Sequence, residues 1–235
     1  MIGRPELLSI IVPVYNEVRT VGAVLDRLLA IDLPVPREIL VVDDGSTDGT
    51  REVLAGLAGS RIVVIHADRN RGKGAAVRRG LEAASGSIVA IQDADLELDP
   101  QQIAFLVAPI LRGETDVVYG SRFLAGRPDA PWITVAANRV LTSVTNLLYG
   151  ASLTDMETCY KIMRTPVARS LRLDADRFDL EPQITARLLR ARHAITELPV
   201  AFDPRSRAQG KKIGWRDGVR ALEVLVAERL RRGAA

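Results

Sequence analysis

The chain has 235 residues, of which 47% are hydrophobic and 26% are charged, and its formal net charge is +3. These values are ordinary for a folded globular protein of one large domain, and they exclude a polyelectrolyte chain. The single cysteine, Cys159, excludes an intramolecular disulfide bond, indicates a reducing compartment and is predicted to be a buried structural thiol.

Five short apolar runs in the first half of the chain predict β-strands that are covered on both faces, because none of them alternates cleanly between apolar and polar residues. Helical spacing of apolar residues, alanine-rich composition and N-capping residues predict a helix after each of the first four strands. The predicted strands are 7–14, 38–42, 61–65, 87–91 and 116–119, and the predicted helices are 17–30, 47–58, 72–84 and 100–112. This alternation predicts an α/β fold with a doubly wound, mostly parallel sheet and flanking helices.

The alternation changes after Arg122. Helices are predicted at 131–149, 181–192 and 216–232, with a strand at about 194–200 and a polar, basic loop at 203–212. One apolar stripe is expected on the first of these helices, formed by Trp132, Val135, Ala136, Val140, Val144, Leu147 and Leu148. We treat residues 1–235 as a single domain with two halves, one to about residue 120 and the other from about residue 121.

Basic residues gather at the C-terminal end of the sequence. Residues 201–235 carry nine Lys/Arg and four Asp/Glu, whereas the first 200 residues are slightly acidic. We recognise no signal peptide and predict no transmembrane helix, because no 18 consecutive residues are apolar. The expected location is cytoplasmic. Two interpretations of helix 131–149 stay open, a peripheral place on the inner face of the cell membrane and a place in the core.

The acidic segment "QDADLE" follows the predicted strand 87–91, and ligands of open α/β sheets bind at the carboxyl ends of strands. In extended backbone, Asp93 and Asp95 point the same way, and Glu97 continues that side. Convergent carboxylates repel one another unless a cation lies between them. Mg²⁺ or Mn²⁺ suits such oxygen ligands, with nucleotide phosphates completing the coordination shell. The alternative is a solvated turn that caps a helix.

Other strand ends carry residues suited to a nucleotide. "VPVYNE" (12–17) offers a rigid kink, an aromatic face and an acceptor, and the two aspartates of "VDDGSTDGT" (42–50) could accept from ribose or base. "NRGKGAAVRRG" (70–80) resembles a small anion site at a helix start. A P-loop and a dinucleotide-binding glycine motif are both absent from the sequence.

These segments, together with "YGSRF", "DMETCYKIMR" and "GKKIGWRDGVRAL", occur in the order found in family 2 glycosyltransferases of the A-type fold, and the chain resembles that family over about residues 7–225. Within the family it is most similar to polyprenyl-phosphate (dolichyl-phosphate) mannosyl- and glucosyltransferases. The resemblance implies a metal-dependent, inverting transfer of a hexose from GDP-mannose or UDP-glucose to a polyprenyl phosphate. The half to about residue 120 is then expected to bind the nucleotide sugar, and the half from about residue 121 to lie on the acceptor side.

The candidate site residues fall into four groups. Contacts to the nucleotide sugar are expected from Pro13, Tyr15, Glu17, Asp43, Asp44, Lys73, Asp93 and Ala94. The expected ligands of Mg²⁺ or Mn²⁺ are Asp95 and Glu97. Catalysis is assigned to Asp93, Asp95, Arg122 and Arg205. The acceptor phosphate is assigned to Arg122, Arg205, Arg207, Lys211 and Lys212, and either Arg205 or Arg207 fills the position of the family's late arginine.

The chemistry of the acceptor separates the alternatives. A phosphate monoester is largely dianionic at neutral pH and needs cationic side chains rather than a base, whereas an alcohol needs a carboxylate base such as Asp155, Glu157 or Asp179. A soluble acceptor, such as phosphoglycerate or a glycan, therefore stays open.

A nucleotidyltransferase is disfavoured because "PVYNE" replaces its glycine-rich loop. A nucleic-acid partner is not expected, since only 4% of residues are aromatic and no recognised motif occurs. The oligomeric state stays open.

Overall fold

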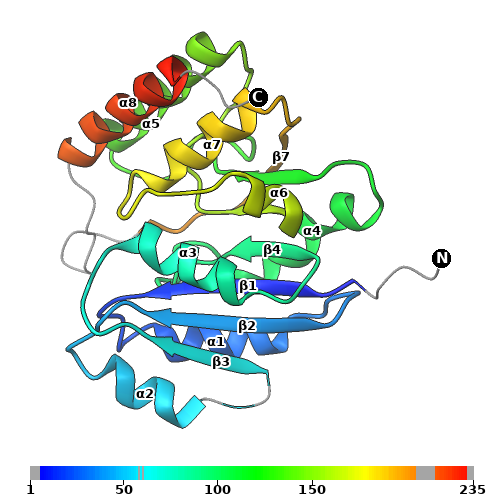
Figure 1. The fold of residues 1–235 in the computed structure, drawn as a ribbon, viewed down its shortest axis with the longest axis vertical. Coiled ribbons are helices and arrows are strands. Elements are labelled where there is room, and N and C mark those ends of the chain that lie inside the picture. Colours follow the sequence, from blue (N-terminus) through cyan, green and yellow to red (C-terminus); the bar gives the residue numbers. More distant parts are fainter. Residues whose placement is uncertain (1–5, 58, 60, 205–214, 232–235) are drawn as a thin grey trace.

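The computed structural model describes residues 6–57, 59, 61–204 and 215–231. Its seven strands form one sheet in the order β3-β2-β1-β4-β6-β5-β7, and among these strands β6 alone runs antiparallel to its neighbours (Figure 1). The strands are β1 (Leu8–Val14), β2 (Arg37–Asp43), β3 (Ile62–His66), β4 (Ile88–Ile91), β5 (Val117–Ser121), β6 (Lys161–Arg164) and β7 (Thr196–Pro199). The predicted mostly parallel, doubly wound sheet is confirmed.

Helices cover both faces of the sheet, with α3 in front of it and α1 behind it in Figure 1. The helices are α1 (Val21–Ala30), α2 (Thr50–Leu57), α3 (Lys73–Ala83), η1 (Pro100–Gln102), α4 (Ile103–Leu111), α5 (Trp132–Tyr149), α6 (Thr165–Ser170), α7 (Leu180–Arg190) and α8 (Trp215–Leu230). The first helix starts four residues later than predicted. The helix predicted from residue 100 begins as a 3₁₀ turn, where the Asp99 side chain accepts from the backbone N–H of Gln101.

Strand β6 and helix α6 were not predicted from the sequence. β6 has only four residues, and it begins with Lys161, which is 1% exposed. Ile162 lies between Ala90 of β4 and Val118 of β5, at the centre of the sheet. A short strand that begins with a buried lysine does not form an apolar run, so local patterning could not identify it.

The core lies on both sides of the central strands, where Ile10, Ile39 and Ala90 are completely buried. A second, smaller cluster packs α5, α7 and α8 against one another, at the top of the view in Figure 1. It consists of Leu141, Met156, Ala186, Ala221 and Leu225. Helix α8 is therefore a packed part of the fold.

Helix α5 does not have the single apolar stripe predicted for it. Val135 and Leu141 are buried, but Trp132, Val140 and Leu147 are 69%, 56% and 85% exposed. The inner face is completed by Thr142 and Thr145, which leaves large apolar side chains on the outer face. In the described part of the chain, neither this helix nor any other has the length and apolarity needed to cross a bilayer.

Candidate active site

The carboxyl ends of β1, β2, β4 and β5 lie at one edge of the sheet, because these strands are parallel to one another. Backbone hydrogen bonds join the segments that leave this edge. Asp44 N–H donates to Val14 C=O (2.8 Å), and Gln92 N–H donates to Ile11 C=O (3.0 Å). The structure thus brings together residues 13–17, 43–44 and 92–97, which the sequence predicted to share a site.

The loop after β1 is held by side chains of the turn after β2. The backbone N–H groups of Asn16, Glu17 and Val18 donate to Ser46 Oγ (2.9 Å), Thr50 Oγ1 (3.0 Å) and Asp48 Oδ2 (3.2 Å). Asn16 makes this possible with a left-handed backbone at φ 54°, a conformation that asparagine tolerates well. The bonds across the two loops also fix the positions of the neighbouring Pro13 and Tyr15, which are half-buried beside them.

Asp43 is completely buried, and both of its carboxylate oxygens have partners. Oδ1 accepts from Ser46 N–H (3.0 Å), and Oδ2 lies 2.7 Å from Arg51 Nε and 3.1 Å from His66 Nδ1. Burial raises the pKa of Asp43, but the hydrogen bonds from Ser46, His66 and Arg51 outweigh burial and lower it. Asp43 therefore stays ionised and holds the end of β2 in place, while its contact with a nucleotide stays a prediction.

Asp44 fixes the loop that leads into α3. Its carboxylate accepts from the backbone N–H groups of Arg71 (3.0 Å) and Gly72 (2.6 Å), and burial raises its pKa. Gly72 has φ +108°, and a Cβ atom there would lie 2.4 Å from Asp176 O. Only glycine suits this position, because a side chain would be strained and would clash with the backbone.

Lys73 is enclosed by two carboxylates. Its Nζ lies 2.8 Å from Asp93 Oδ1 and 2.7 Å from Glu181 Oε1, and its side chain is only 12% exposed. Burial lowers the pKa of Lys73, but its carboxylate neighbours, Asp93 first, raise it well above the usual value. The sequence placed Lys73 in a small anion site, and the structure shows its ammonium group facing acids of its own chain. The sequence also missed Glu181, whose Glu-Pro pair signalled only a helix start.

The expectation that residues 93–97 are extended is wrong. β4 ends at Ile91, Leu96 has a left-handed backbone at φ 63°, and Glu97 N–H donates to Asp95 Oδ1 (3.1 Å). We call residues 93–97 the acidic turn. Its first acid, Asp93, points to Lys73, while Ala94 is buried.

A divalent ion could be held at the acidic turn by Asp95 and Glu97. Both residues are half-buried and supply the hard oxygen donors that Mg²⁺ and Mn²⁺ prefer. Within the described ranges, no three His, Cys, Asp or Glu residues are grouped closely enough to hold a metal ion by themselves. The residues therefore fit an ion that takes its remaining ligands from a bound nucleotide or from water, and their role as metal ligands stays a prediction.

Arg122 lies directly after β5 and is fixed from two sides. Its Nε and Nη2 atoms each lie 2.7 Å from an oxygen of the fully buried Asp155, and its guanidinium group stacks 5.2 Å from the ring centre of Phe202. Asp155 is held in turn by Glu197, which accepts from the backbone N–H of Asp155 (2.9 Å). Burial lowers the pKa of Arg122, but the charges of Asp155, Glu157 and Glu97 raise it. Arg122 is therefore a fixed cation close to the acidic turn.

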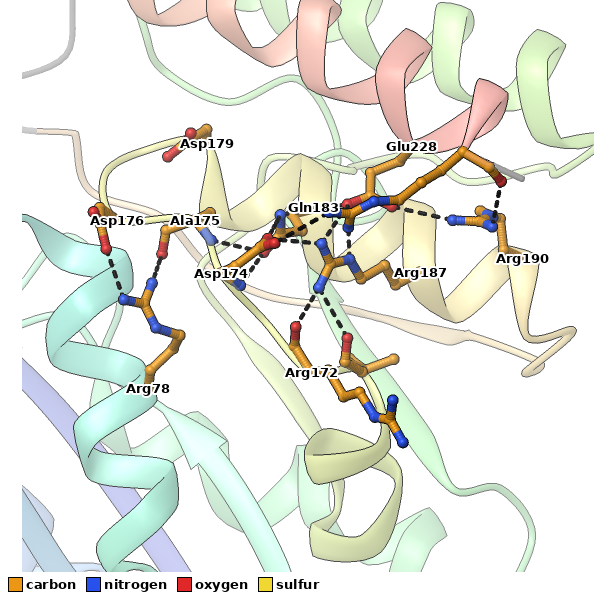
Figure 2. A network of polar contacts seen from close by, with 12 residues as sticks. Arg78, Arg172, Asp174, Ala175, Asp176, Asp179, Gln183, Arg187, Arg190 and Glu228 are labelled. Carbon is orange, nitrogen blue, oxygen red and sulfur yellow. Dashed lines mark hydrogen bonds and ion pairs between the residues drawn. The ribbon is translucent and has the colours of Figure 1, made fainter. Parts of the chain in front are cut away.

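A polar network joins the C-terminal helix to the loop that packs against Gly72. In Figure 2, Arg187 of α7 lies between Glu228 of α8 and the loop residue Asp174, at 2.5 Å and 2.7 Å respectively. Arg78 of α3 binds the same loop through Asp176 (2.7 Å). Helices α3, α7 and α8 thus meet at residues 174–176. Their contacts fix this loop, which packs against Gly72 next to Lys73.

An open groove of about 1000 Å³ lies beside this loop. One side is formed by residues 69–71, which Asp44 holds, and the other side by residues 174–179 and the start of α8. Arg69, Arg177 and Arg220 line it together with Asp176 and Asp217, so its lining carries both signs of charge. Asp179 at this groove accepts from Arg177 N–H (3.0 Å) and pairs with Arg220 (3.3 Å).

Four of the predicted phosphate-binding residues, Arg205, Arg207, Lys211 and Lys212, lie outside the described residues. The preceding segment reaches the acidic turn, because Asp203 N–H donates to Glu97 C=O (2.9 Å).

The prediction that Cys159 is buried is confirmed. The residue is 8% exposed, and burial raises the pKa of its thiol well above the usual value.

A family model described as "Glycosyl transferase family 2" matches residues 9–172. A dodecaprenyl-phosphate galacturonate synthase from Rhizobium johnstonii is 30% identical over 71% of this chain and 50% of its own length. An undecaprenyl-phosphate 4-deoxy-4-formamido-L-arabinose transferase from Aeromonas hydrophila is 34% identical over 64% of this chain and 46% of its own length. The chain thus spans about half the length of these curated relatives.

Among solved structures, glucosyl-3-phosphoglycerate synthase from Mycobacterium tuberculosis, in complex with Mn²⁺, UDP and phosphoglyceric acid, has the same fold. It superposes with a TM-score of 0.75 at 22% identity, covering 98% of this chain and 80% of that one. A second structure of that protein, with its product glucosyl-3-phosphoglycerate, gives a TM-score of 0.72. The predicted A-type glycosyltransferase fold is confirmed.

Proposed function

The chain belongs to glycosyl transferase family 2, and on that premise we propose that it transfers a sugar from a nucleotide diphosphate to a polyprenyl phosphate. The observation that carries the proposal is the position of the acidic turn beside the fixed cation Arg122, at the edge where four parallel strands end. The names of the curated relatives, which are polyprenyl-phosphate sugar transferases, support the same acceptor.

Sugar transfer requires this edge of the sheet to bind the nucleotide sugar, to stabilise the departing diphosphate and to hold the acceptor phosphate. As the bond between the anomeric carbon and the diphosphate breaks, negative charge grows on the departing diphosphate. Asp95 and Glu97 would hold Mg²⁺ or Mn²⁺, which when bound would supply the positive charge that stabilises the diphosphate. The sugar lies against Asp93, whose orientation Lys73 fixes, and Pro13, Tyr15, Glu17 and the segment at Asp43 border the nucleotide.

The acceptor attacks the anomeric carbon from the face opposite the leaving group, so a single displacement inverts the configuration. Arg122 is suited to hold a phosphate near the already anionic donor, because Asp155 and Phe202 fix its position. Two of the possible bases for an alcohol acceptor are already engaged. Asp155 uses both oxygens on Arg122, and Asp179 accepts from Arg177 and Arg220. This arrangement favours a phosphate acceptor, which needs no base.

A transfer assay tests the proposal directly. Purified protein is incubated with labelled UDP- or GDP-sugars, Mn²⁺ or Mg²⁺, and either a polyprenyl phosphate in detergent or phosphoglycerate. We expect label in the organic phase, formed only with the polyprenyl phosphate and stopped by EDTA. GDP-mannose and UDP-glucose are the donors that we propose, and a panel of other nucleotide sugars identifies the donor if neither reacts. Label that stays in water with phosphoglycerate alone would refute the lipid acceptor.

The outer face of α5 supports a peripheral place on a membrane. We define this face by Trp132, Ile133, Val140 and Leu147, all more than half exposed. The neighbouring helix α8 exposes Arg216 and Arg229, and the exposed Arg231 follows it directly. Apolar side chains next to arginines suit the interface of an anionic leaflet. The proposed location is therefore cytoplasmic, on the inner face of the cell membrane.

Replacing Trp132 and Leu147 together with serine is expected to weaken vesicle binding. Each side chain loses the burial of a large apolar group, so we expect the affinity to fall at least about tenfold. Flotation with vesicles of phosphatidylglycerol and phosphatidylcholine measures the effect. Phe105→Ser is the matched control, because Phe105 is 53% exposed on α4. Equal binding by the double variant and the control would contradict the proposed membrane face.

A further inference from the structure

Glu157 interacts electrostatically with Arg122 and with Glu181, the partner of Lys73, and it has no role in the function described above. It belongs to the segment between α5 and β6, two residues after Asp155, which binds Arg122. The charges that act on it come from Arg122 after β5, Lys161 on β6, Glu181 on α7 and Asp155 in its own segment. Glu181 in turn pairs with Lys73 and so reaches Asp93.

The carboxyl group of Glu157 has an unused acceptor. Its Oε1 atom is buried, yet it accepts no hydrogen bond from any residue that the structure describes. The nearby cations are used elsewhere: Arg122 donates to Asp155, and Lys161 Nζ donates to the backbone carbonyls of Met156 (2.9 Å) and Thr158. Buried polar atoms of folded proteins nearly always have partners, so this oxygen is available to a group that the described residues do not supply.

The environment of Glu157 favours the neutral carboxylic acid. Burial raises its pKa most, the charges of Glu181 and Asp155 raise it further, and Lys161 and Arg122 offset only part of this, so that the pKa is about 7. A neutral carboxyl group offers one O–H donor besides its acceptor oxygens. Beside the guanidinium group of Arg122, such a donor suits a phosphate oxygen, whereas an ionised carboxylate would repel the phosphate.

We propose that Glu157, in its protonated form, donates a hydrogen bond to the acceptor phosphate bound by Arg122 and is therefore an additional acceptor-specificity residue. This inference rests on the proposed function, because it takes the acceptor to be a phosphate monoester. The residue transfers no proton in the reaction. It selects a phosphate dianion while protonated and loses this ability when it ionises.

The pH dependence of acceptor binding tests the inference. For the wild type we expect KM for a short-chain polyprenyl phosphate to rise roughly tenfold between pH 7 and 8.5, because binding needs the protonated form of a group that titrates near pH 7. Glu157→Gln keeps an N–H donor at every pH, so its KM should change less than about twofold, with kcat close to the wild-type value. Glu82→Gln, at an exposed glutamate of α3, is the matched control and should follow the wild type.

Two results would overturn the inference. One is a large loss of kcat in Glu157→Gln with unchanged KM, which would make Glu157 a base. The other is the same rise of KM with pH in the wild type and in Glu157→Gln. Calorimetric titration with geranyl phosphate separates this inference from the proposed function, because it needs no transfer. Binding that weakens with pH in the wild type but not in Glu157→Gln supports the inference even if no transfer occurs, and pH-independent binding by the wild type refutes it.

Discussion

Asp95→Ala is expected to lower kcat at least about 10³-fold while the protein stays folded. The expected loss follows from the several kcal/mol by which a metal ion stabilises a leaving group, since each 1.36 kcal/mol corresponds to tenfold in rate. Asp95 is half-buried on the acidic turn, where its Oδ1 accepts from Glu97 N–H. The unliganded protein should therefore lose only about 1 kcal/mol of stability.

Thermal unfolding with and without Mn²⁺ and nucleotide separates a lost metal site from a lost fold. The wild type should be stabilised by the ligands together, because binding to the native state raises the apparent stability. Asp95→Ala should unfold near the wild-type temperature without ligand and gain little from Mn²⁺ with nucleotide. Asp129→Ala, at an exposed aspartate after β5, serves as the control. Full activity of Asp95→Ala, or wild-type activity in EDTA, would show that Asp95 does not hold a catalytic ion.

Lys73→Met should lower the free energy of unfolding by about 3–5 kcal/mol, because it removes the cation that two largely buried carboxylates share. Asp93 and Glu181 are only 27% and 9% exposed in their side chains, and each lies within 3 Å of Lys73 Nζ. For a chain of this size the loss corresponds to a fall in Tm of roughly 6–20 °C. Transfer activity should fall as well, since Asp93, which we propose to contact the sugar, loses the partner that fixes its orientation.

The double variant Lys73→Met/Glu181→Gln tests the physical cause. If the loss of the shared cation is responsible, removing one of the two carboxylates should restore at least about half of the lost stability, as measured by denaturant unfolding at pH 7. The raised pKa of Lys73 also fixes the sign of the pH effect: the wild-type stabilisation is complete below the usual lysine pKa of 10.5 and is lost only at higher pH. A double variant as unstable as Lys73→Met would show that packing, rather than charge, accounts for the loss.

Six of the seven strands could be predicted because each is a local feature of the sequence. β1, β2, β3, β4, β5 and β7 all coincide with predicted segments, with ends shifted by one or two residues. Such runs identify themselves through composition and length, without reference to their neighbours. The alternation with helices then makes the sheet parallel, which brings the strand ends, and with them the candidate site, to one edge. The order of the motifs along the chain was sufficient to predict the family.

The three-dimensional contacts decided what each site residue does. The sequence placed Asp43, Asp44 and Lys73 at the site, but their partners Arg51, Gly72 and Glu181 became visible only in the folded chain. The backbone of the acidic turn also departs from the extended form on which its predicted geometry rested, because Leu96 takes a left-handed conformation.

The sequence by itself therefore determined the class of fold, the family and the edge of the sheet where the site lies. Only the tertiary structure decided that Lys73 faces two acids, that Arg122 is fixed by Asp155, that α5 turns apolar residues outward and that Glu157 keeps a buried oxygen without a partner in the described chain. The physical reason is the range of the interactions. Periodicity depends on residues a few positions apart, whereas the partner and the pKa of a charged group depend on residues that meet only when distant segments pack.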